Sequence, residues 1–232
     1  MVLQHKHVLI TGGFSGIGRA LADLLLQSKA RVTAVGRTAA AAPPASDGYF
    51  PLVCDIASEA DGRAVAQQAS EHFGPVDILV HCAGEGILKA APQLTADDFE
   101  RSMRDNFYSA VWMTQALLPA LMERQEGTLI YVPGVLGKSP MAGAAAYGAS
   151  KYALVGYVKS LREDLKRTRV RVTTLFFGGV DSPFWDPIDL RVQRDKMISI
   201  PDAAKAIWFA AQQPESAVLS ELVLQPFNHQ VI

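Results

Sequence analysis

Thr11-Gly-Gly-Phe-Ser-Gly-Ile-Gly18 directly follows a short apolar run at residues 7–10, and apolar residues then recur at helical spacing over residues 16–28. This pattern predicts a buried parallel strand, a tight turn and a helix. Glycines suit such a turn because the backbone can bend sharply and a pyrophosphate can approach it closely. The free N–H groups and the positive end of the helix would then hold the phosphates. The stretch therefore predicts a nucleotide-binding unit, and a purely structural turn is the alternative.

The alternation of strand and helix continues along the chain. Strands separated by long helices require right-handed crossovers, which place the strands in a parallel sheet covered on both faces. We therefore expect one α/β domain over residues 1–232, of the Rossmann type with a doubly wound parallel sheet. The further strands are predicted over residues 31–35, 50–54, 76–80, 128–132 and 170–176, and the long helices over residues 96–125 and 147–166.

Two segments interrupt this alternation. Residues 38–46 are rich in alanine but contain two prolines, so a surface loop is expected where a crossover helix would be usual. Residues 181–200 begin with two prolines and two aromatic residues, Phe184 and Trp185. A short lid over a substrate and a simple excursion loop are both consistent with this composition.

The composition excludes several classes of protein. Apolar residues make up 49% of the chain and charged residues 19%, which rules out a disordered protein. The 22 basic and 23 acidic side chains leave a net charge of −1, so we expect neither nucleic acid nor a membrane surface as a partner. No apolar run is long enough to span a membrane, and no secretory signal is visible. Cys54 and Cys82 form no disulfide framework, which favours a reducing, cytoplasmic location.

A second motif, Tyr147-Gly-Ala-Ser-Lys151, lies in the helix predicted over residues 147–166. Positions i and i+4 share one face of a helix, so the phenol and the ammonium would be neighbours. An adjacent ammonium stabilises the phenolate and lowers the pKa of the tyrosine. A tyrosine tuned in this way can give a proton to a carbonyl oxygen as hydride arrives, or remove it in the reverse direction.

Together these motifs resemble the short-chain dehydrogenase/reductase family, over essentially the whole chain. The glycine motif of the family matches residues 11–18, and its active-site tyrosine and lysine match Tyr147 and Lys151. The resemblance implies that Asn106 holds a proton-relay water and that Lys151 also binds the nicotinamide ribose. It therefore implies Tyr147, Lys151 and Asn106 as the catalytic residues.

The same resemblance implies a set of cofactor-binding residues. The acidic residue that contacts the adenine ring corresponds to Asp55. The motif after the fourth strand is here His81-Cys82-Ala83-Gly84, and the segment near the nicotinamide carboxamide is Phe177-Gly-Gly-Val-Asp-Ser182. The full expected set is Gly12, Phe14, Ser15, Gly16, Ile17, Gly18, Arg37, Thr38, Asp55, Ile56, Cys82, Ala83, Gly84, Tyr147, Lys151, Gly178, Val180 and Ser182.

One position departs from the family where catalysis is concerned. The serine that donates a hydrogen bond to the substrate oxygen in this family falls at Gly134. Ser139, close by in sequence, could replace it, as could a water, and the glycine could also make room for a bulkier substrate. The alternative function is a non-catalytic NADP-binding regulator or interaction protein of the same fold.

Cofactor choice is inferred from Gly36-Arg37-Thr38, at the end of the second predicted strand. An acidic side chain there would bind the ribose hydroxyls and repel a 2′-phosphate, whereas a guanidinium and a hydroxyl suit a phosphate. Because we expect nothing acidic to oppose Arg37, we expect NADP rather than NAD. The alternative is that Arg37 is only a solvated surface residue.

The sequence therefore predicts an NADP-dependent oxidoreductase that interconverts a small-molecule carbonyl compound and a secondary alcohol. The five histidines have no ligand spacing, so no metal site is expected. The family resemblance implies a homodimer or homotetramer formed through the two long helices. Apolar residues of the second of these helices exceed one buried stripe: Ala153, Leu154, Tyr157, Val158 and Leu161.

Overall fold

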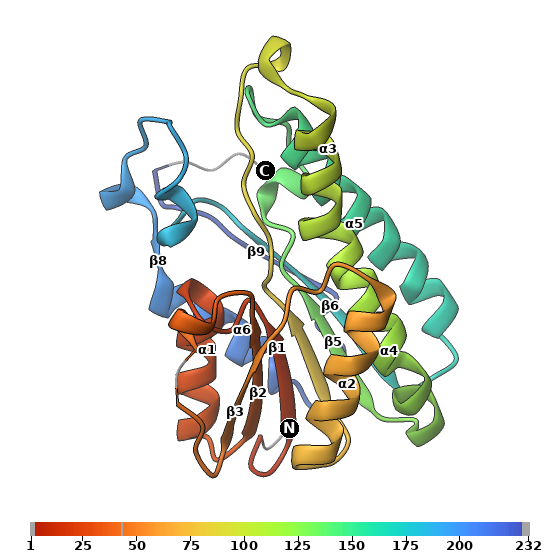
Figure 1. Cartoon of the computed structure of the whole chain (residues 1–232). Coiled ribbons are helices and arrows are strands. Elements are labelled where there is room, and N and C mark those ends of the chain that lie inside the picture. The colour runs from red at the N-terminus through yellow and green to blue at the C-terminus, as the bar shows by residue number, and fades with distance from the viewer. Residues whose placement is uncertain (1–2, 43, 229–232) are drawn as a thin grey trace.

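A parallel sheet forms the centre of the molecule (Figure 1). The computed structural model describes residues 3–42 and 44–228. Within them, seven strands pair in the order β3-β2-β1-β4-β5-β6-β9, and every pairing is parallel. The predicted Rossmann-type sheet is confirmed. Its strands are β1 (His7–Thr11), β2 (Arg31–Gly36), β3 (Tyr49–Val53), β4 (Ile78–His81), β5 (Gly127–Tyr131), β6 (Val170–Phe177) and β9 (Glu221–Leu224).

The strand order reverses beside β1. β2 and β3 lie on one side of it, whereas β4, β5, β6 and β9 lie on the other. Thr11 at the end of β1 pairs with His81 at the end of β4, so the turns that follow these two residues leave the same edge of the sheet. Proteins of this class bind ligands in the crevice that opens at such a point.

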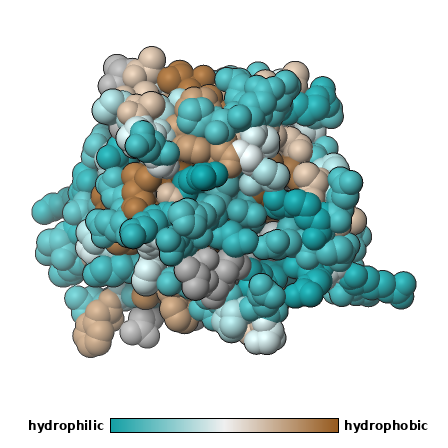
Figure 2. Space-filling view, turned by 90° about the horizontal axis from the view of Figure 1, so that it is seen from below, coloured by the Kyte–Doolittle hydropathy of each residue, from teal (hydrophilic) through white to brown (hydrophobic). Residues whose placement is uncertain are grey.

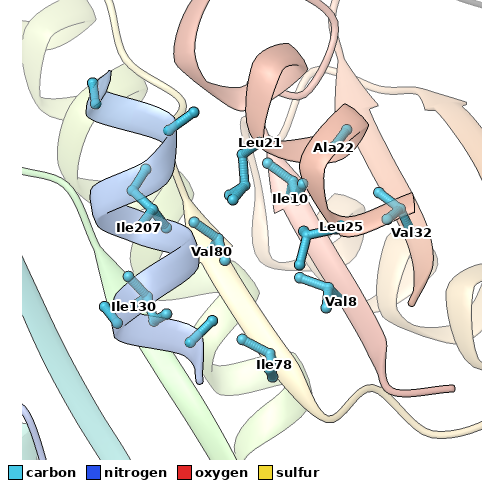
Figure 3. Close-up of a cluster of buried hydrophobic side chains, with 14 of the residues drawn as sticks. Val8, Ile10, Leu21, Ala22, Leu25, Val32, Ile78, Val80, Ile130 and Ile207 are labelled. Atoms are coloured by element: carbon cyan, nitrogen blue, oxygen red, sulfur yellow. The ribbon is translucent and has the colours of Figure 1, made fainter. Parts of the chain in front are cut away.

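One face of the sheet is covered by α1 (Gly16–Gln27) and α6 (Ile200–Ala211). Figure 3 shows how Leu21 of α1 and Ile207 of α6 point towards Ile10 and Val80 on the strands. All four side chains are fully buried. This packing fixes the start of α1 against the carboxyl end of β1.

The other face is covered by α2 (Glu59–Phe73), α4 (Ser109–Arg124) and α5 (Ala145–Leu165). Leu9 and Leu79 point to this face, in alternation with the residues that face α1 and α6. Strands buried on both faces explain the continuous apolar runs in the sequence.

The region expected as one helix over residues 96–125 is divided by a π-helical turn. α3 (Ala96–Met103) leads into the π turn (Arg104–Tyr108), which leads into α4. A π turn is wider than an α turn and changes the direction in which side chains point. Asp105 and Asn106 are both buried here, and the expectation of an uninterrupted α-helix is wrong at this turn.

The two irregular segments differ in their structure. In the alanine-rich segment the described residues 38–42 and 44–46 contain only a short 3-10 turn, Ala39–Ala41, which confirms the expected loop; Pro43 lies outside the described residues. Residues 181–200, here called the excursion, begin at β7 (Val180–Asp181) and end at β8 (Ile198–Ser199). These two short strands pair with each other and close the excursion at its base.

The end of the molecule opposite the crevice is mainly hydrophilic. Figure 2 shows it from below, with hydrophobic residues only in small separate areas. No helix among the described residues is both long and apolar enough to cross a membrane.

Candidate active site

The glycine-rich turn brings β1, α1 and the turn after β4 into direct contact. Gly12 has a φ of +70°, and a Cβ at this residue would lie 2.9 Å from the nitrogen of Ala83. A Cβ at Gly18 would lie 2.3 Å from the carbonyl oxygen of Gly12. A larger residue at Gly12 would push the turn away from the segment after β4, and one at Gly18 would push α1 away from the turn. The glycines therefore allow the amino end of α1 to reach the crevice.

The amino end of α1 is open towards a cleft of about 1100 Å³. Ser15 is the N-cap residue, but its side chain makes no capping hydrogen bond, and the first turn contains no acidic residue. Ser15, Gly16, Ile17 and Gly18 all line the cleft. Because the first N–H groups of a helix lack internal partners and carry a partial positive charge, this end suits an anion such as a diphosphate.

A smaller cavity of about 230 Å³ adjoins this cleft beside β2. A Cβ at Gly36 would lie 2.3 Å from the ring of Phe14, so the ring fills the space that a side chain at the end of β2 would need. The residues expected to bind the adenosine half of a cofactor lie together in the lining of this cavity: Phe14, Arg37, Thr38, Asp55 and Ile56.

Arg37 has two acidic neighbours. Its Nη1 lies 3.1 Å from Oδ2 of Asp105 and 3.7 Å from Oε2 of Glu85. Both acids come from distant parts of the sequence, so the expectation that nothing acidic opposes Arg37 is wrong. The guanidinium is half exposed at the mouth of the smaller cavity.

Tyr147 and Lys151 lie one turn apart on α5 and both line the large cleft. Nζ of Lys151 is 5.3 Å from the centroid of the Tyr147 ring, and only 4% of Lys151 is exposed. Burial lowers the pKa of Lys151 to about 8. Burial also raises the pKa of Tyr147 above its ordinary value of 10.0. The expected lowering of the tyrosine pKa is therefore wrong here, because desolvation of the phenolate outweighs a charge at this distance.

Asn106 and Lys151 both lie beside Gly84. The Asn106 Oδ1 accepts a hydrogen bond from the Glu85 N–H at 3.0 Å, and its Nδ2 donates to the carbonyls of Glu85 and Ser102, both at 3.0 Å. A Cβ at Gly84 would lie 2.5 Å from the Asn106 Oδ1 and 3.0 Å from the Lys151 Nζ. The fold therefore brings the three predicted catalytic residues, Tyr147, Lys151 and Asn106, to one place.

Gly134 follows β5 and also lines the large cleft. Its φ is +75° and its ψ is 171°. The nearest atom to a Cβ at this residue would be the carbonyl oxygen of Phe177, at 3.5 Å. Space is therefore available for a side chain, but the backbone conformation is unfavourable for one. Ser139 lies in the lining of the same cleft as Tyr147.

The other predicted cofactor-binding residues are found around this cleft. Burial raises the pKa of Cys82 to about 12, so its thiol stays protonated at neutral pH and is no nucleophile. A Cβ at Gly178 would lie 2.5 Å from Pro226, which leaves no room for a larger residue there. The predicted cofactor-binding residues in this part of the lining are Gly12, Cys82, Ala83, Gly84, Gly178, Val180 and Ser182.

The excursion reaches over the tyrosine. The ring of Phe184 lies 5.7 Å from the ring of Tyr147, and a Cβ at Gly86 would lie 2.3 Å from Phe184. Arg194 holds the start of the excursion by donating to the Asp181 carboxylate at 2.5 Å. It also donates to the Asp186 carboxylate at 2.7 Å and to a backbone carbonyl at 3.0 Å.

Three polar residues of the site, Glu85, Asp105 and His81, were given no functional role from the sequence. Glu85 and Asp105 are the neighbours of Gly84 and Asn106, and this adjacency was the only available signal. His81 is fully buried, its Nδ1 lies 2.7 Å from the Thr11 Oγ1, and its Nε2 has no partner among the described residues. Burial lowers the pKa of His81 to about 3, so the ring is uncharged. No group of residues suited to a metal ion occurs in the described part of the chain.

Comparison with known proteins identifies the family. The family model described as short chain dehydrogenase matches residues 6–192. The sepiapterin reductase of Chlorobaculum tepidum is 33% identical, with 95% of this chain and 96% of that protein aligned. An uncharacterized oxidoreductase of Staphylococcus epidermidis is 28% identical over 97% of this chain and 98% of its own.

Solved structures agree with these matches. The closed form of serine dehydrogenase complexed with NADP+ has a TM-score of 0.87 at 25% identity, covering 97% of this chain and 96% of that one. Serine dehydrogenase from Escherichia coli has a TM-score of 0.85 at 26% identity, covering 97% of this chain and 100% of that one. The sequence match extends over most of the chain, and the fold places the glycine-rich turn and the Tyr147–Lys151 pair in one cleft. The chain therefore belongs to the short chain dehydrogenase family of oxidoreductases.

Proposed function

We propose that the protein is an NADP-dependent oxidoreductase that interconverts a carbonyl compound and a secondary alcohol. The observation that carries this proposal is the convergence of Tyr147, Lys151 and Asn106 beside the open amino end of α1. A proton donor, a buried cation and an anion-binding helix end then border the same cleft. This combination suits hydride transfer coupled to proton transfer.

The residues present fit a bound dinucleotide. The glycine-rich turn leaves the amino end of α1 uncovered, so a diphosphate can approach the backbone N–H groups. Asp55 and Ile56 would contact the adenine, and Lys151 would hold the nicotinamide ribose. The segment after β6, with Gly178, Val180 and Ser182, would contact the nicotinamide end.

Each catalytic side chain has a defined part in this chemistry. The bound cofactor supplies or accepts the hydride. Because burial raises its pKa, the Tyr147 hydroxyl is protonated at neutral pH and can donate its proton to the carbonyl oxygen. Lys151, with a pKa of about 8, is mostly charged at pH 7 and stabilises the negative charge that develops on the substrate oxygen. Both amide atoms of Asn106 are hydrogen-bonded, which fixes the π turn beside Lys151.

Arg37 and Thr38 favour NADP over NAD in this proposal. Both residues line the smaller cavity, where the adenosine would lie, and a guanidinium with a hydroxyl can bind a 2′-phosphate. Phe14 packs against Gly36 and leaves no room for the acidic side chain that would select NAD at that position. The solved serine dehydrogenase in complex with NADP+ is similar to this chain along almost its full length, which is consistent with the proposal.

The substrate part of the cleft has mainly apolar walls. These walls favour a small carbonyl compound with an apolar substituent. The excursion and the loops after β4 and β5 form these walls. Their apolar side chains include Leu88, Met141, Phe184, Trp185 and Leu190.

A panel of aldehydes and ketones, followed by NADPH absorbance, tests the proposal. We expect turnover by the wild type and a loss of about 100-fold or more in Tyr147→Phe, which removes the proton donor with little change in shape. NADPH affinity should stay within about twofold of the wild type in this variant, because the ring of residue 147, Lys151 and the glycine-rich turn are all retained. Full activity of Tyr147→Phe would refute the catalytic assignment.

One outcome of the same experiment favours the alternative function. Gly134, where the family has a serine, is consistent with a protein that binds NADPH without turning over a substrate. Tight NADPH binding with no turnover of any carbonyl compound would support that non-catalytic binding protein instead.

A further inference from the structure

Five charged side chains are joined by ion pairs and are here called the rim cluster: Arg37, Glu85, Arg101, Arg104 and Asp105. Two of them, Arg37 and Asp105, line the smaller cavity. Three guanidinium groups face two carboxylates. The cluster joins the end of β2, the residue after Gly84, α3 and the π turn. Segments that are far apart in the sequence therefore meet at the mouth of the cavity.

Each carboxylate of the rim cluster is held by two arginines. Asp105 lies 2.7 Å from Arg104 and 3.1 Å from Arg37. Glu85 lies 2.5 Å from Arg101 and 3.7 Å from Arg37. Arg37 is the arginine that the two acids share, and each acid has a closer arginine of its own. Arg37 can therefore move away from both carboxylates, because each carboxylate still has an arginine partner. An unpaired buried carboxylate would be costly.

The two members of the Arg37–Asp105 pair differ in burial. The side chain of Arg37 is 50% exposed, whereas that of Asp105 is 7% exposed. A half-exposed guanidinium can reorient in solvent, but the carboxylate is fixed by the π turn. Burial disfavours the charged form of Asp105, yet its interactions with Arg104, Glu85 and Arg37 keep its pKa below the ordinary value. The cavity thus has a fixed negative charge beside a movable positive one.

We infer that Asp105 is a specificity-determining residue, whose carboxylate competes with the 2′-phosphate of the cofactor for Arg37 and so limits the preference for NADP over NAD. The inference rests on the proposed function, in which Arg37 receives this phosphate. To bind it, Arg37 must leave Asp105, and the phosphate must then lie near the remaining carboxylate. A cofactor without the phosphate meets neither cost, because Arg37 stays paired.

Calorimetric titration of the full chain with two adenosine nucleotides tests the inference. Adenosine 2′,5′-bisphosphate carries the 2′-phosphate and AMP does not, so their affinities separate the effect of the phosphate from that of the adenosine. Asp105→Asn keeps the shape and removes the charge. We expect this variant to bind the bisphosphate about tenfold more tightly than the wild type, which is about 1.4 kcal/mol of binding free energy. Its affinity for AMP should stay within about twofold of that of the wild type.

Two further variants serve as controls. Asp97→Asn makes the same change of charge on α3, where Asp97 is 73% exposed and pairs only with Arg101, at 3.9 Å, in the described structure. It should leave both affinities unchanged. In an Arg37→Ala background, Asp105→Asn should raise the affinity for the bisphosphate by only about threefold or less, because the competition for Arg37 no longer exists.

The possible results separate this inference from the proposed function. Weaker binding of the bisphosphate by Asp105→Asn, or an equal change for both nucleotides, overturns the inference alone. A wild type that binds neither nucleotide overturns the proposed function and this inference with it. Thermal unfolding of each variant shows whether a loss of binding comes from a loss of folded protein.

Discussion

At the scale of single residues, the backbone at Gly134 restricts what can stand there. A φ of +75° with a ψ of 171° belongs to a region that is essentially limited to glycine. A serine at this position would require the peptide to rotate, although the surrounding space would accept a small side chain. The absence of a side chain at Gly134 is therefore tied to the conformation of the loop, and a substitution there must change this conformation.

Gly134→Ser should therefore lower the free energy of unfolding by about 1–3 kcal/mol, the usual cost of such a backbone conformation for a residue with a side chain. It should also lower kcat/KM, because the loop that lines the cleft must shift. Urea titration and steady-state kinetics measure the two effects. Gly134→Ala is the matched control, since it adds the same strain without a hydroxyl. A Gly134→Ser variant faster than the wild type would contradict this expectation.

The buried Lys151 should make stability depend on pH in an unusual direction. Its pKa falls from 10.5 to about 8 on folding, because burial disfavours the ammonium. Between these pH values the unfolded chain binds a proton that the folded chain lacks, so the lysine's contribution to stability rises with pH across this interval. The free energy of unfolding of the wild type, minus that of Lys151→Met, should increase from pH 8 to pH 10. A difference that is flat or falls with pH would show that Lys151 is not desolvated.

Residues of the site could be predicted where neighbours in space are also neighbours in sequence. Tyr147 and Lys151 are placed together by the i, i+4 geometry of a helix alone. Arg37 and Asp105 are 68 positions apart, and only the folded chain brings them together. The predicted direction of the shift in the Tyr147 pKa was wrong for the same reason, because burial is a property of the tertiary structure.

At the scale of elements, one side chain of the excursion, Arg194, makes several of the contacts that hold it in place. Arg194 contacts two carboxylates and a backbone carbonyl at the start of the excursion. These contacts keep the 3-10 turn Pro183–Trp185 in place, and with it Phe184 over Tyr147. An element that covers the proposed proton donor and is tied at a few points is suited to open for substrate entry.

Arg194→Met should loosen the excursion, because it keeps the apolar stem but removes all three of these hydrogen bonds. We expect kcat/KM for the carbonyl substrate to fall about fivefold or more, mainly through KM, and the excursion to be cleaved faster by a protease. Arg191→Met is the matched control, since Arg191 is exposed in the same excursion and makes no ion pair in the described structure. Equal effects of the two substitutions would argue against a specific clamp.

Elements with strong periodicity were predictable, whereas weakly patterned ones were not. The strands of the sheet centre have continuous apolar runs, and they were found to within a few residues. The helix α2 was not predicted, because its buried face includes the small residues Gly62, Ala66 and Ala69, which give little hydrophobic contrast. The strand β9 has four residues and is only partly buried, so its pattern is too short to recognise. The π turn has no sequence signature of its own.

At the scale of the whole molecule, exposed aromatic residues gather on the elements that pack beside α5. Phe99 of α3 is 43% exposed, Tyr108 of the π turn 43% and Tyr152 of α5 45%. Leu154 and Val158 lie instead in the core beneath α5, as does Leu161, so the expectation that these residues add outer apolar surface is wrong. The exposed aromatic residues, which sequence periodicity did not identify, are the better argument for a contact between copies of this chain.

A homodimer or homotetramer formed through this surface should be sensitive to a charge at Tyr152. In an interface with twofold symmetry each copy contributes the same patch, so Tyr152→Arg introduces two like charges at once. We expect light scattering to give twice the chain mass of 25.0 kDa or more for the wild type, and half of the wild-type mass for Tyr152→Arg. Phe209→Arg is the matched control, because Phe209 is 53% exposed but lies on α6, which covers the other face of the sheet.

If the wild type is a monomer, or if only Phe209→Arg dissociates the assembly, the contact does not run through α3 and α5. A dimer that dissociates only with Tyr152→Arg would place the contact on the helix that also carries Tyr147 and Lys151, so the loss of assembly should then also lower kcat.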